Sequence, residues 1–294
     1  MSPMLRTTSK FLLRAIPAVF VVTGTAALLA FSLVAPASST AGRAPARTAD
    51  LASVVHSVRM DPPASSRFAD SQSNNWSGYG LGYLSSNTLY SSISGTWVVP
   101  AAKQETKGQA EHGATWIGIG GGCYSTSCTG SDETLIQAGT EQDVSKKGKA
   151  SYSAWYELIP ETSTTESIKI NPGDVINCSI VQTSQGQWTI KLTDKTDKQS
   201  FTESTAYPSD ESTAEWIVET PVVVGGGGTG VANLPNLGKV KFTNAQVNGG
   251  PAGLVAADAI QLVDSNNKPL ATPSKPTAGG TAFVDCTYAS TCKA

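Results

Sequence analysis

One short segment, residues 213–219 (TAEWIVE), places two carboxylates in what reads as an apolar strand. Alternate side chains of a strand share a face, so Glu215 and Glu219 point one way and Trp216 and Val218 the other. Carboxylates inside an apolar strand cost free energy unless they face a cleft or have partners. The segment therefore predicts a sheet with one face that carries chemistry.

Two further segments repeat this pattern. Residues 135–141 (LIQAGTE) place Gln137 and Glu141 on one face of a strand, and residues 154–160 (AWYELIP) set Glu157 among aromatic residues. Three apolar strands that carry acid or amide groups on one face predict a sheet whose concave side performs the chemistry.

The rest of the chain favours an all-β fold. Helix-period segments are scarce, and short β-rich runs recur with turn signals between them. Residues 184–187 (SQGQ) read as a hairpin loop between two such runs, and residues 248–251 (NGGP) stop the alternating run 239–247. The pattern predicts an antiparallel two-sheet β-sandwich that forms one domain over residues 74–294.

The N-terminal part reads as targeting and processing sequence. Basic residues precede an apolar run (residues 15–35), and a small-residue cleavage site follows it. Residues 1–37 are therefore predicted to be a secretory signal peptide, with a membrane anchor as the alternative. Residues 38–73 are rich in Ala, Ser and Pro and suit a propeptide or flexible spacer. We expect a secreted, extracellular protein that is not bound to membranes once the signal is removed.

Charge and histidine content exclude several functions. From Asn74 onward the chain has 14 lysines, no arginine and 20 acidic residues, a formal balance of −6. Phosphate and base recognition favour arginine, so we expect no nucleic-acid binding. The only histidines are His56, in the predicted propeptide, and His112, which we expect to be a solvated loop residue. A histidine-rich zinc site cannot be built; we expect no metal, no cofactor and a monomer.

Five cysteines bear on stability: Cys123, Cys128, Cys178, Cys286 and Cys292. Disulfides are expected in a secreted chain. The two close pairs, 123/128 and 286/292, would each close a short loop and leave Cys178 as a buried free thiol. Crossed pairings stay open at this point.

Five motifs in order carry a family resemblance: Asn75-Trp76-Ser77-Gly78, Trp116-Ile117-Gly118-Ile119-Gly120, Ile136-Gln137-Ala138-Gly139, Trp155-Tyr156-Glu157 and Ala214-Glu215-Trp216-Ile217-Val218-Glu219. Together they resemble the glutamic peptidases, or eqolisins, which are secreted acid endopeptidases. The resemblance implies a concanavalin-like sandwich of two sheets, one of which lines the substrate groove, and protein or peptide substrates.

The resemblance also implies a catalytic dyad. Glu219 falls on the family's catalytic glutamate and would activate water as general base. Gln137 falls on the glutamine that stabilises the oxyanion. No metal and no covalent intermediate is required, and we expect insensitivity to pepstatin. Loss of the segment before Asn74 would activate a zymogen.

Other residues are assigned to the groove by the same resemblance. The predicted substrate-binding residues are Trp76, Trp116, Glu141, Glu157 and Tyr156. Glu157 could also tune Glu219, since a like charge raises the pKa of a carboxyl group. Glu215 is expected to pair with a lysine. The glycines of 225–228 are expected to form a surface loop, with a flap or an autoprocessing site as alternatives.

Two departures from fungal members remove acids near the dyad. The turn Gly120-Gly121-Gly122 lacks an aspartate, and Thr220 follows Glu219 where those members have another acid. We therefore predict an acidic optimum less extreme than in fungal relatives. The alternatives are a glycoside hydrolase or carbohydrate-binding module on the same sandwich, with Glu219 and Glu157 as paired carboxylates, and a non-catalytic secreted binding module.

Overall fold

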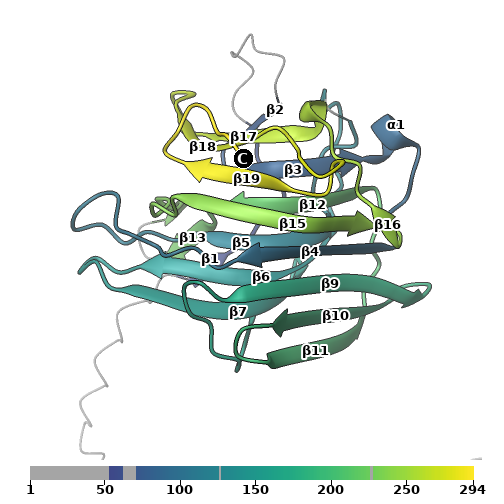
Figure 1. Cartoon of the computed structure of the whole chain (residues 1–294), viewed down its shortest axis with the longest axis horizontal. Helices are drawn as coiled ribbons and strands as arrows, with labels where there is room; N and C mark the ends of the chain where they lie inside the picture. The colour runs from purple at the N-terminus through teal and green to yellow at the C-terminus, as the bar shows by residue number, and fades with distance from the viewer. Residues whose placement is uncertain (1–52, 62–70, 126, 226–227) are drawn as a thin grey trace, which may run out of the picture. The chain divides into compact units, whose positions relative to one another are not determined.

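The computed structural model describes residues 53–61, 71–125, 127–225 and 228–294, and strands dominate it (Figure 1). The predicted signal peptide and the start of the predicted propeptide lie outside the described residues. The elements are β1 (Ser53–Val55), β2 (Ser71–Ser73), β3 (Trp76–Gly82), α1 (Tyr83–Ser86), β4 (Ser92–Val98), β5 (Ala114–Gly120), β6 (Leu135–Val144), β7 (Ala150–Ile159), β8 (Thr164–Glu166), β9 (Val175–Ser184), β10 (Gln187–Asp194), β11 (Gln199–Ala206), β12 (Thr213–Glu219), β13 (Val222–Gly225), β14 (Gly228–Val231), β15 (Lys239–Val247), β16 (Gly250–Pro251), a 3-10 turn (Ala256–Asp258), β17 (Ala259–Val263), β18 (Pro269–Pro273) and β19 (Phe283–Thr287).

The strands form two packed layers, which confirms the predicted sandwich. Hydrogen bonding runs in the order β11-β10-β9-β4-β15-β19-β18-β17-β3-β12-β5-β6-β7-β8. The path folds back on itself, so that β4 packs on β5, β9 on β6 and β15 on β12. We call β3, β12, β5, β6 and β7 the inner layer. The opposing layer, with β9, β4 and β15, lies toward the viewer in Figure 1.

The core between the layers follows from strand alternation. Trp216 and Val218 of β12 point into it and pack with residues such as Ile117, Trp97 and Phe242. Each buried aromatic side chain removes a large apolar area from water, which makes this cluster the main source of stability. Because alternation is strict, the intervening side chains of β12 must point to the other side of the inner layer. We call that side the site face.

The predicted β9–β10 hairpin is confirmed, and so are the two disulfides between close cysteines. Ser184 pairs with Gln187 at the β9–β10 hairpin. The disulfides are Cys123–Cys128 and Cys286–Cys292, and Cys178 is a buried free thiol.

Gly225 and Gly228, the ends of the glycine run, pair with each other as strand residues, and residues 226 and 227 lie outside the described residues. Residues 222–225 and 228–231 make the β13–β14 hairpin, to which β1 adds a third strand. None of the described helices is both long and apolar enough to cross a bilayer.

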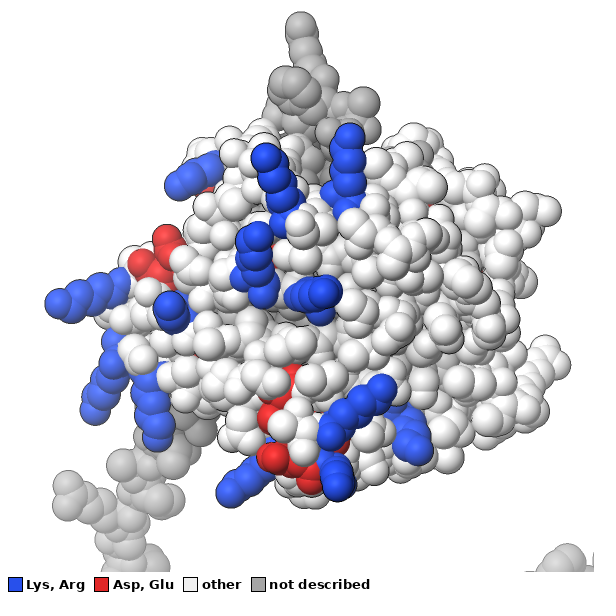
Figure 2. Space-filling model, in the orientation of Figure 1, with Lys and Arg blue, Asp and Glu red and all other residues white. Residues whose placement is uncertain are grey.

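Charged side chains are distributed unevenly. On the side seen in Figure 2, basic side chains gather over the left and lower parts of the face, with small groups of acids among them. Four acids of the inner layer, Glu141, Glu157, Glu215 and Glu219, are instead buried or largely buried. Because buried acids are costly, their position on one side of one sheet indicates where a functional site lies.

Candidate active site

The site face begins with a cluster of buried apolar side chains. Its members come from six strands: Trp76, Ala114, Trp116, Leu135, Trp155, Ile217 and Ile260. The tryptophans Trp76 and Trp116 meet edge to face, with ring centroids 4.9 Å apart. Such aromatic pairs are rigid, so this floor holds the polar groups around it in fixed positions.

Glu219 stands at the end of β12, at the border of this cluster. In the sheet register it lies between Trp76 of β3 and Ala114 of β5. Its side chain is fully buried, and the indole Nε1 of Trp116 donates a hydrogen bond of 2.9 Å to its Oε2.

Gln137 and Glu157 are direct neighbours across β6 and β7. The amide Nε2 of Gln137 donates a hydrogen bond of 2.8 Å to Oε2 of Glu157. Burial raises the pKa of Glu157 to about 8; the charges of Glu219 and Glu141 add to this, whereas His56 and the Gln137 amide oppose it. Glu157 is therefore a neutral acid throughout the acidic range.

Glu215 shares a sheet row with Gln137, with Gly118 between them. The space above Gly118 is filled, however: a Cβ there would lie 2.9 Å from Cζ3 of Trp116 and 3.0 Å from Cδ1 of Leu135. These two side chains separate Glu215 from the amide. Glu219, by contrast, is near enough to Glu157 to affect its pKa.

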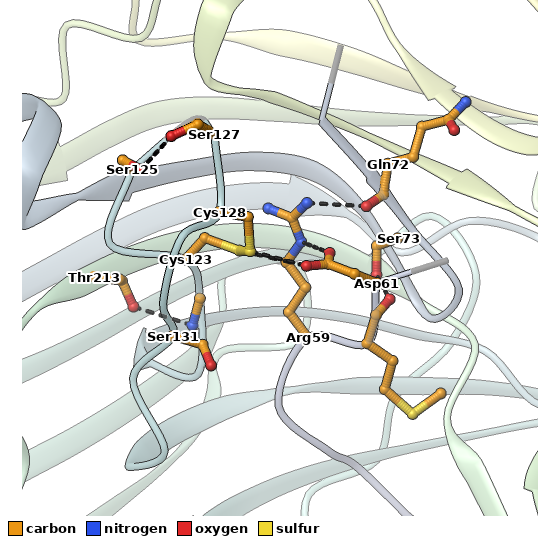
Figure 3. Close-up of a disulfide and its surroundings, with 12 residues drawn as sticks. Arg59, Asp61, Gln72, Ser73, Cys123, Ser125, Ser127, Cys128, Ser131 and Thr213 are labelled. Carbon is orange, nitrogen blue, oxygen red and sulfur yellow. Dashed lines mark hydrogen bonds and ion pairs between the residues drawn. A yellow bond between two sulfur atoms is a disulfide. The ribbon is translucent and has the colours of Figure 1, made fainter. Parts of the chain in front are cut away.

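Glu215 is fully buried, and burial raises its pKa well above the usual range, against the opposing effects of Thr213 and Arg59. The lysine partner expected for it is not found: among the described residues no lysine forms an ion pair with this carboxyl group. The cation that affects it is Arg59, which lies beside the Cys123–Cys128 disulfide (Figure 3) and comes from the segment before the predicted domain.

Comparisons with known proteins identify the family of the chain. Residues 74–288 match the model of the Peptidase A4 family. The chain belongs to the peptidase A4 family. It is 26% identical over 212 residues to aspergillopepsin-2 of Aspergillus niger, which covers 65% of this chain and 70% of the relative. It is 29% identical over 208 residues to scytalidopepsin B of Scytalidium lignicola, which covers 68% and 73%.

Solved structures support the same family. Scytalido-glutamic peptidase with a transition state analog inhibitor is similar to this chain at a TM-score of 0.55 and 25% identity, covering 73% of this chain and 98% of that one. A second structure of that peptidase, with a peptide-based transition state analog, gives a TM-score of 0.57 at 24% identity and shows the same fold over 73% of this chain and 98% of that one. The protein is thus a glutamic-type peptidase, and the glycoside hydrolase alternative falls away.

The peptidase A4 match begins at residue 74, yet the site face is covered by residues 53–61, which we call the leader segment. His56 lies between two carboxylates: its Nδ1 is 2.7 Å from Oε2 of Glu219 and its Nε2 is 2.8 Å from Oε1 of Glu141. Its ring stacks on Trp155 at 3.7 Å between centroids. Burial alone would lower the pKa of His56, but the two carboxylates outweigh burial and raise it well above 6.5.

Sequence reasoning missed this residue because it assigned His56 to a propeptide without structure. One signal was present: SVVHSV (residues 53–58) is a strand-like run inside a leader otherwise rich in Ala, Ser and Pro.

Two further expectations need correction. Tyr156, predicted to bind substrate, points to the core side of β7 and packs against Phe201 at 6.2 Å between ring centroids. Neighbouring strand residues point to opposite faces, so it cannot share the site face with Glu157. His112 is not a solvated loop residue: its Nδ1 is 3.0 Å from Oδ1 of Asp143, and that hydrogen bond raises its pKa despite partial burial.

Proposed function

We propose that the protein is an acid endopeptidase that uses Glu219 as general base and Gln137 as oxyanion donor. One observation carries the assignment. Of the two buried glutamates of β12, only Glu219 lies close enough to affect the acid that holds the Gln137 amide, whereas Trp116 and Leu135 screen Glu215 from that amide.

The proposed reaction begins with a water molecule on Glu219. Ionised Glu219, oriented by the Trp116 indole, takes a proton from the water as it attacks the scissile carbonyl carbon. The carbonyl oxygen becomes an oxyanion. Glu219 then returns the proton to the nitrogen of the leaving amine, the C–N bond breaks, and the two peptide products separate. The reaction is a hydrolysis, in which nothing is oxidised or reduced.

Gln137 suits the oxyanion role because a primary amide has two N–H donors. One is bound to Glu157, which fixes the plane of the amide, and the second remains for the developing oxyanion. A neutral, fixed donor costs no reorganisation during the reaction. Neutral Glu157 also avoids a like charge beside Glu219 at acidic pH.

The setting of this activity is part of the proposal. Residues 1–37 would direct secretion, and residues 38–73 would be removed to give the mature domain of residues 74–294. The lack of acids at Gly120-Gly121-Gly122 and at Thr220 supports an optimum that is acidic but less extreme than in fungal relatives.

The test is digestion of casein between about pH 2 and pH 7 by secreted, processed protein, with pepstatin and EDTA present. Glu219→Gln and Gln137→Ala are compared with Glu215→Gln, a matched control for a buried glutamate on the same strand. We expect Gln137→Ala to cost about 10²–10³-fold in kcat, Glu219→Gln to abolish cleavage, and Glu215→Gln to retain it. Loss in Glu215→Gln with retention in Glu219→Gln would move the base to Glu215.

A further inference from the structure

We propose that Asp174, Asp194 and Asp197 form a calcium-binding site that ties together two loops of the opposing layer. Asp174 directly precedes β9, and the other two aspartates lie at the hairpin between β10 and β11, the strands that continue this layer beyond β9 (Figure 1). None of these strands contributes to the site face, so the inference is independent of the proposed function. It departs from the expectation of no metal, which followed from the lack of histidine, because calcium binds oxygen ligands.

The spacing of the three carboxylates suits calcium. One carboxylate oxygen of each aspartate lies within 4.8 Å of one from each of the other two. Two oxygens on the same calcium ion lie at most about 5 Å apart, whereas two on the same magnesium ion lie at most about 4 Å apart. Asp174 and Asp194 are buried and Asp197 is exposed, so water can reach the ion from one side and complete its coordination.

A buried oxygen without a partner is the second observation. Oδ1 of Asp194 accepts hydrogen bonds from the backbone N–H groups of Thr196, at 2.8 Å, and Asp197, at 3.3 Å. Asp194 is 0% exposed, yet its Oδ2 has no hydrogen-bond donor among the described residues. A buried carboxylate oxygen costs free energy unless it is paired or binds a metal. Because Oδ1 is turned to the backbone of the hairpin, Oδ2 is the oxygen left for a cation.

No basic side chain in the described part of the chain neutralises this cluster. Lys195 and Lys198 of the same hairpin are exposed. The ion pairs that the described residues form include none of the three aspartates. Carboxylates at this spacing repel one another, and the repulsion is stronger where burial excludes water. A divalent cation placed among them would convert that repulsion into attraction.

Asn171 supplies a fourth ligand. Its backbone N–H donates to Oδ2 of Asp174 at 2.7 Å, which holds the residue beside the cluster. Its side-chain Nδ2 is 3.4 Å from the same oxygen and 3.5 Å from Oδ2 of Asp197, and both distances are long for hydrogen bonds. A half-turn of the amide would bring its oxygen to this place instead. That orientation is repulsive without a cation and favourable with one, since amide oxygens are calcium ligands.

The two loops are joined by hydrogen bonds before any ion binds. The backbone N–H of Val175 donates to Oγ1 of Thr196 at 2.9 Å, and the backbone N–H of Lys195 donates to the carbonyl of Val175 at 2.8 Å. These bonds hold the ligands near one another, which lowers the cost of ordering them. In the unfolded chain the ligands are not held together. Calcium would therefore bind the folded state and stabilise it.

The first arm of the test measures the Tm of the secreted protein at about pH 6, because carboxylate ligands must be deprotonated to bind a metal. Calcium sites of extracellular modules have Kd values of about 10⁻⁴–10⁻³ M. At about 10 mM calcium chloride we therefore expect the Tm to rise by about 3–10 °C relative to protein in EDTA. Magnesium chloride at the same concentration supplies the same ionic strength and should have little effect.

Variants test whether these aspartates cause the rise. Asp194→Asn keeps the shape of the side chain and the Oδ1 acceptor, and Asp197→Asn changes an exposed residue; each should lose most of the rise. Asp264→Asn is the matched control, because Asp264 also accepts backbone N–H groups in a hairpin turn, and it should keep the full rise. No rise with calcium, an equal rise with magnesium, or a rise that both cluster variants retain would overturn the proposal.

The second arm locates the ion by amide hydrogen exchange. Residues 194–199 should exchange about tenfold or more slowly in about 10 mM calcium chloride than in EDTA, because the ion must leave before this hairpin opens. Residues 264–268, in the hairpin of the control variant, should slow less. Slowing that spares residues 194–199 would place the ion elsewhere in the chain and contradict the assignment to these three aspartates.

Discussion

Glu157 provides a sharp test of the site, because its predicted role requires it to carry a proton. Its pKa of about 8 means that roughly one molecule in 10⁴ has it ionised at about pH 4. Glutamine has the same shape as the neutral acid and can accept the hydrogen bond from Gln137 Nε2 through its own carbonyl oxygen. We therefore expect Glu157→Gln to keep kcat/KM within about threefold of wild type between about pH 3 and pH 5.

Removal of the side chain should behave differently. Glu157→Ala leaves the buried Nε2 of Gln137 without its acceptor, and an unsatisfied buried donor costs about 1–3 kcal/mol. If the lost hydrogen bond lets the Gln137 amide turn away from the oxyanion, the same free energy is lost from the transition state, and kcat/KM drops by about 5- to 150-fold. The contrast between glutamine and alanine, rather than either value alone, tests the assignment.

The assay is kcat/KM on a quenched-fluorescence peptide across pH, with processed protein whose circular dichroism matches wild type. Across the acidic range Glu157→Gln should follow the pH profile of the wild type, because both carry an uncharged group beside Glu219 there. If Glu157→Gln is as inactive as Glu157→Ala in acid, then Glu157 must ionise or donate a proton, and the reasoning is refuted.

Two further predictions concern buried groups away from the dyad. Burial raises the pKa of Asp285 to about 7, so its proton stabilises the fold fully below about pH 4, and roughly 4 kcal/mol is lost as the pH rises through 7. Asp285→Asn should therefore raise the Tm at about pH 8 but not at about pH 4, whereas the exposed Glu161→Gln should do neither; a gain that is equal at both values would contradict this. Burial also raises the pKa of Cys178, so iodoacetamide should label this thiol only after denaturation, and native-state labelling by mass spectrometry would contradict its burial.

The strand period of the sequence is enough to predict the two faces of β12. Alternation places Trp216 and Val218 in the core and Glu215 and Glu219 on the other side, as the structure has them. Applied to β7, the same rule separates Tyr156 from Glu157, so the error over Tyr156 arose from following the family motif instead of the period. Strand faces were therefore predictable wherever periodicity alone was used.

The role of His56 could not be predicted in the same way. It contacts Glu219 across a sequence separation of 163 residues, and no local pattern fixes such a contact. Nor does strand alternation tell which of Glu215 and Glu219 is the proposed general base, because the two residues share a face. Only the packing of Trp116 and Leu135 above Gly118 distinguishes them, and packing depends on the assembled sheet.

The counter-ions of the site face lead to a last prediction, because they come from outside the proposed mature domain. His56 and Arg59 are the cations that oppose the raised pKa values of Glu141, Glu157 and Glu215 in the described residues, and both precede residue 74. Once the leader segment departs, these carboxyl groups lose their cations and keep the acids that raise their pKa values, Glu219 beside Glu141 and Glu157, and Asp132 beside Glu215.

Carboxyl groups with raised pKa values bind protons in the folded state that the unfolded chain releases, so the folded domain is favoured as the pH falls. The processed protein should thus have a lower Tm than the full chain at about pH 7, and the difference should shrink at about pH 4. A difference that is the same at both pH values would mean that the leader segment stabilises by packing alone. If the difference does shrink, one set of buried acids explains both why the precursor is stable near neutrality and why the mature peptidase requires acid.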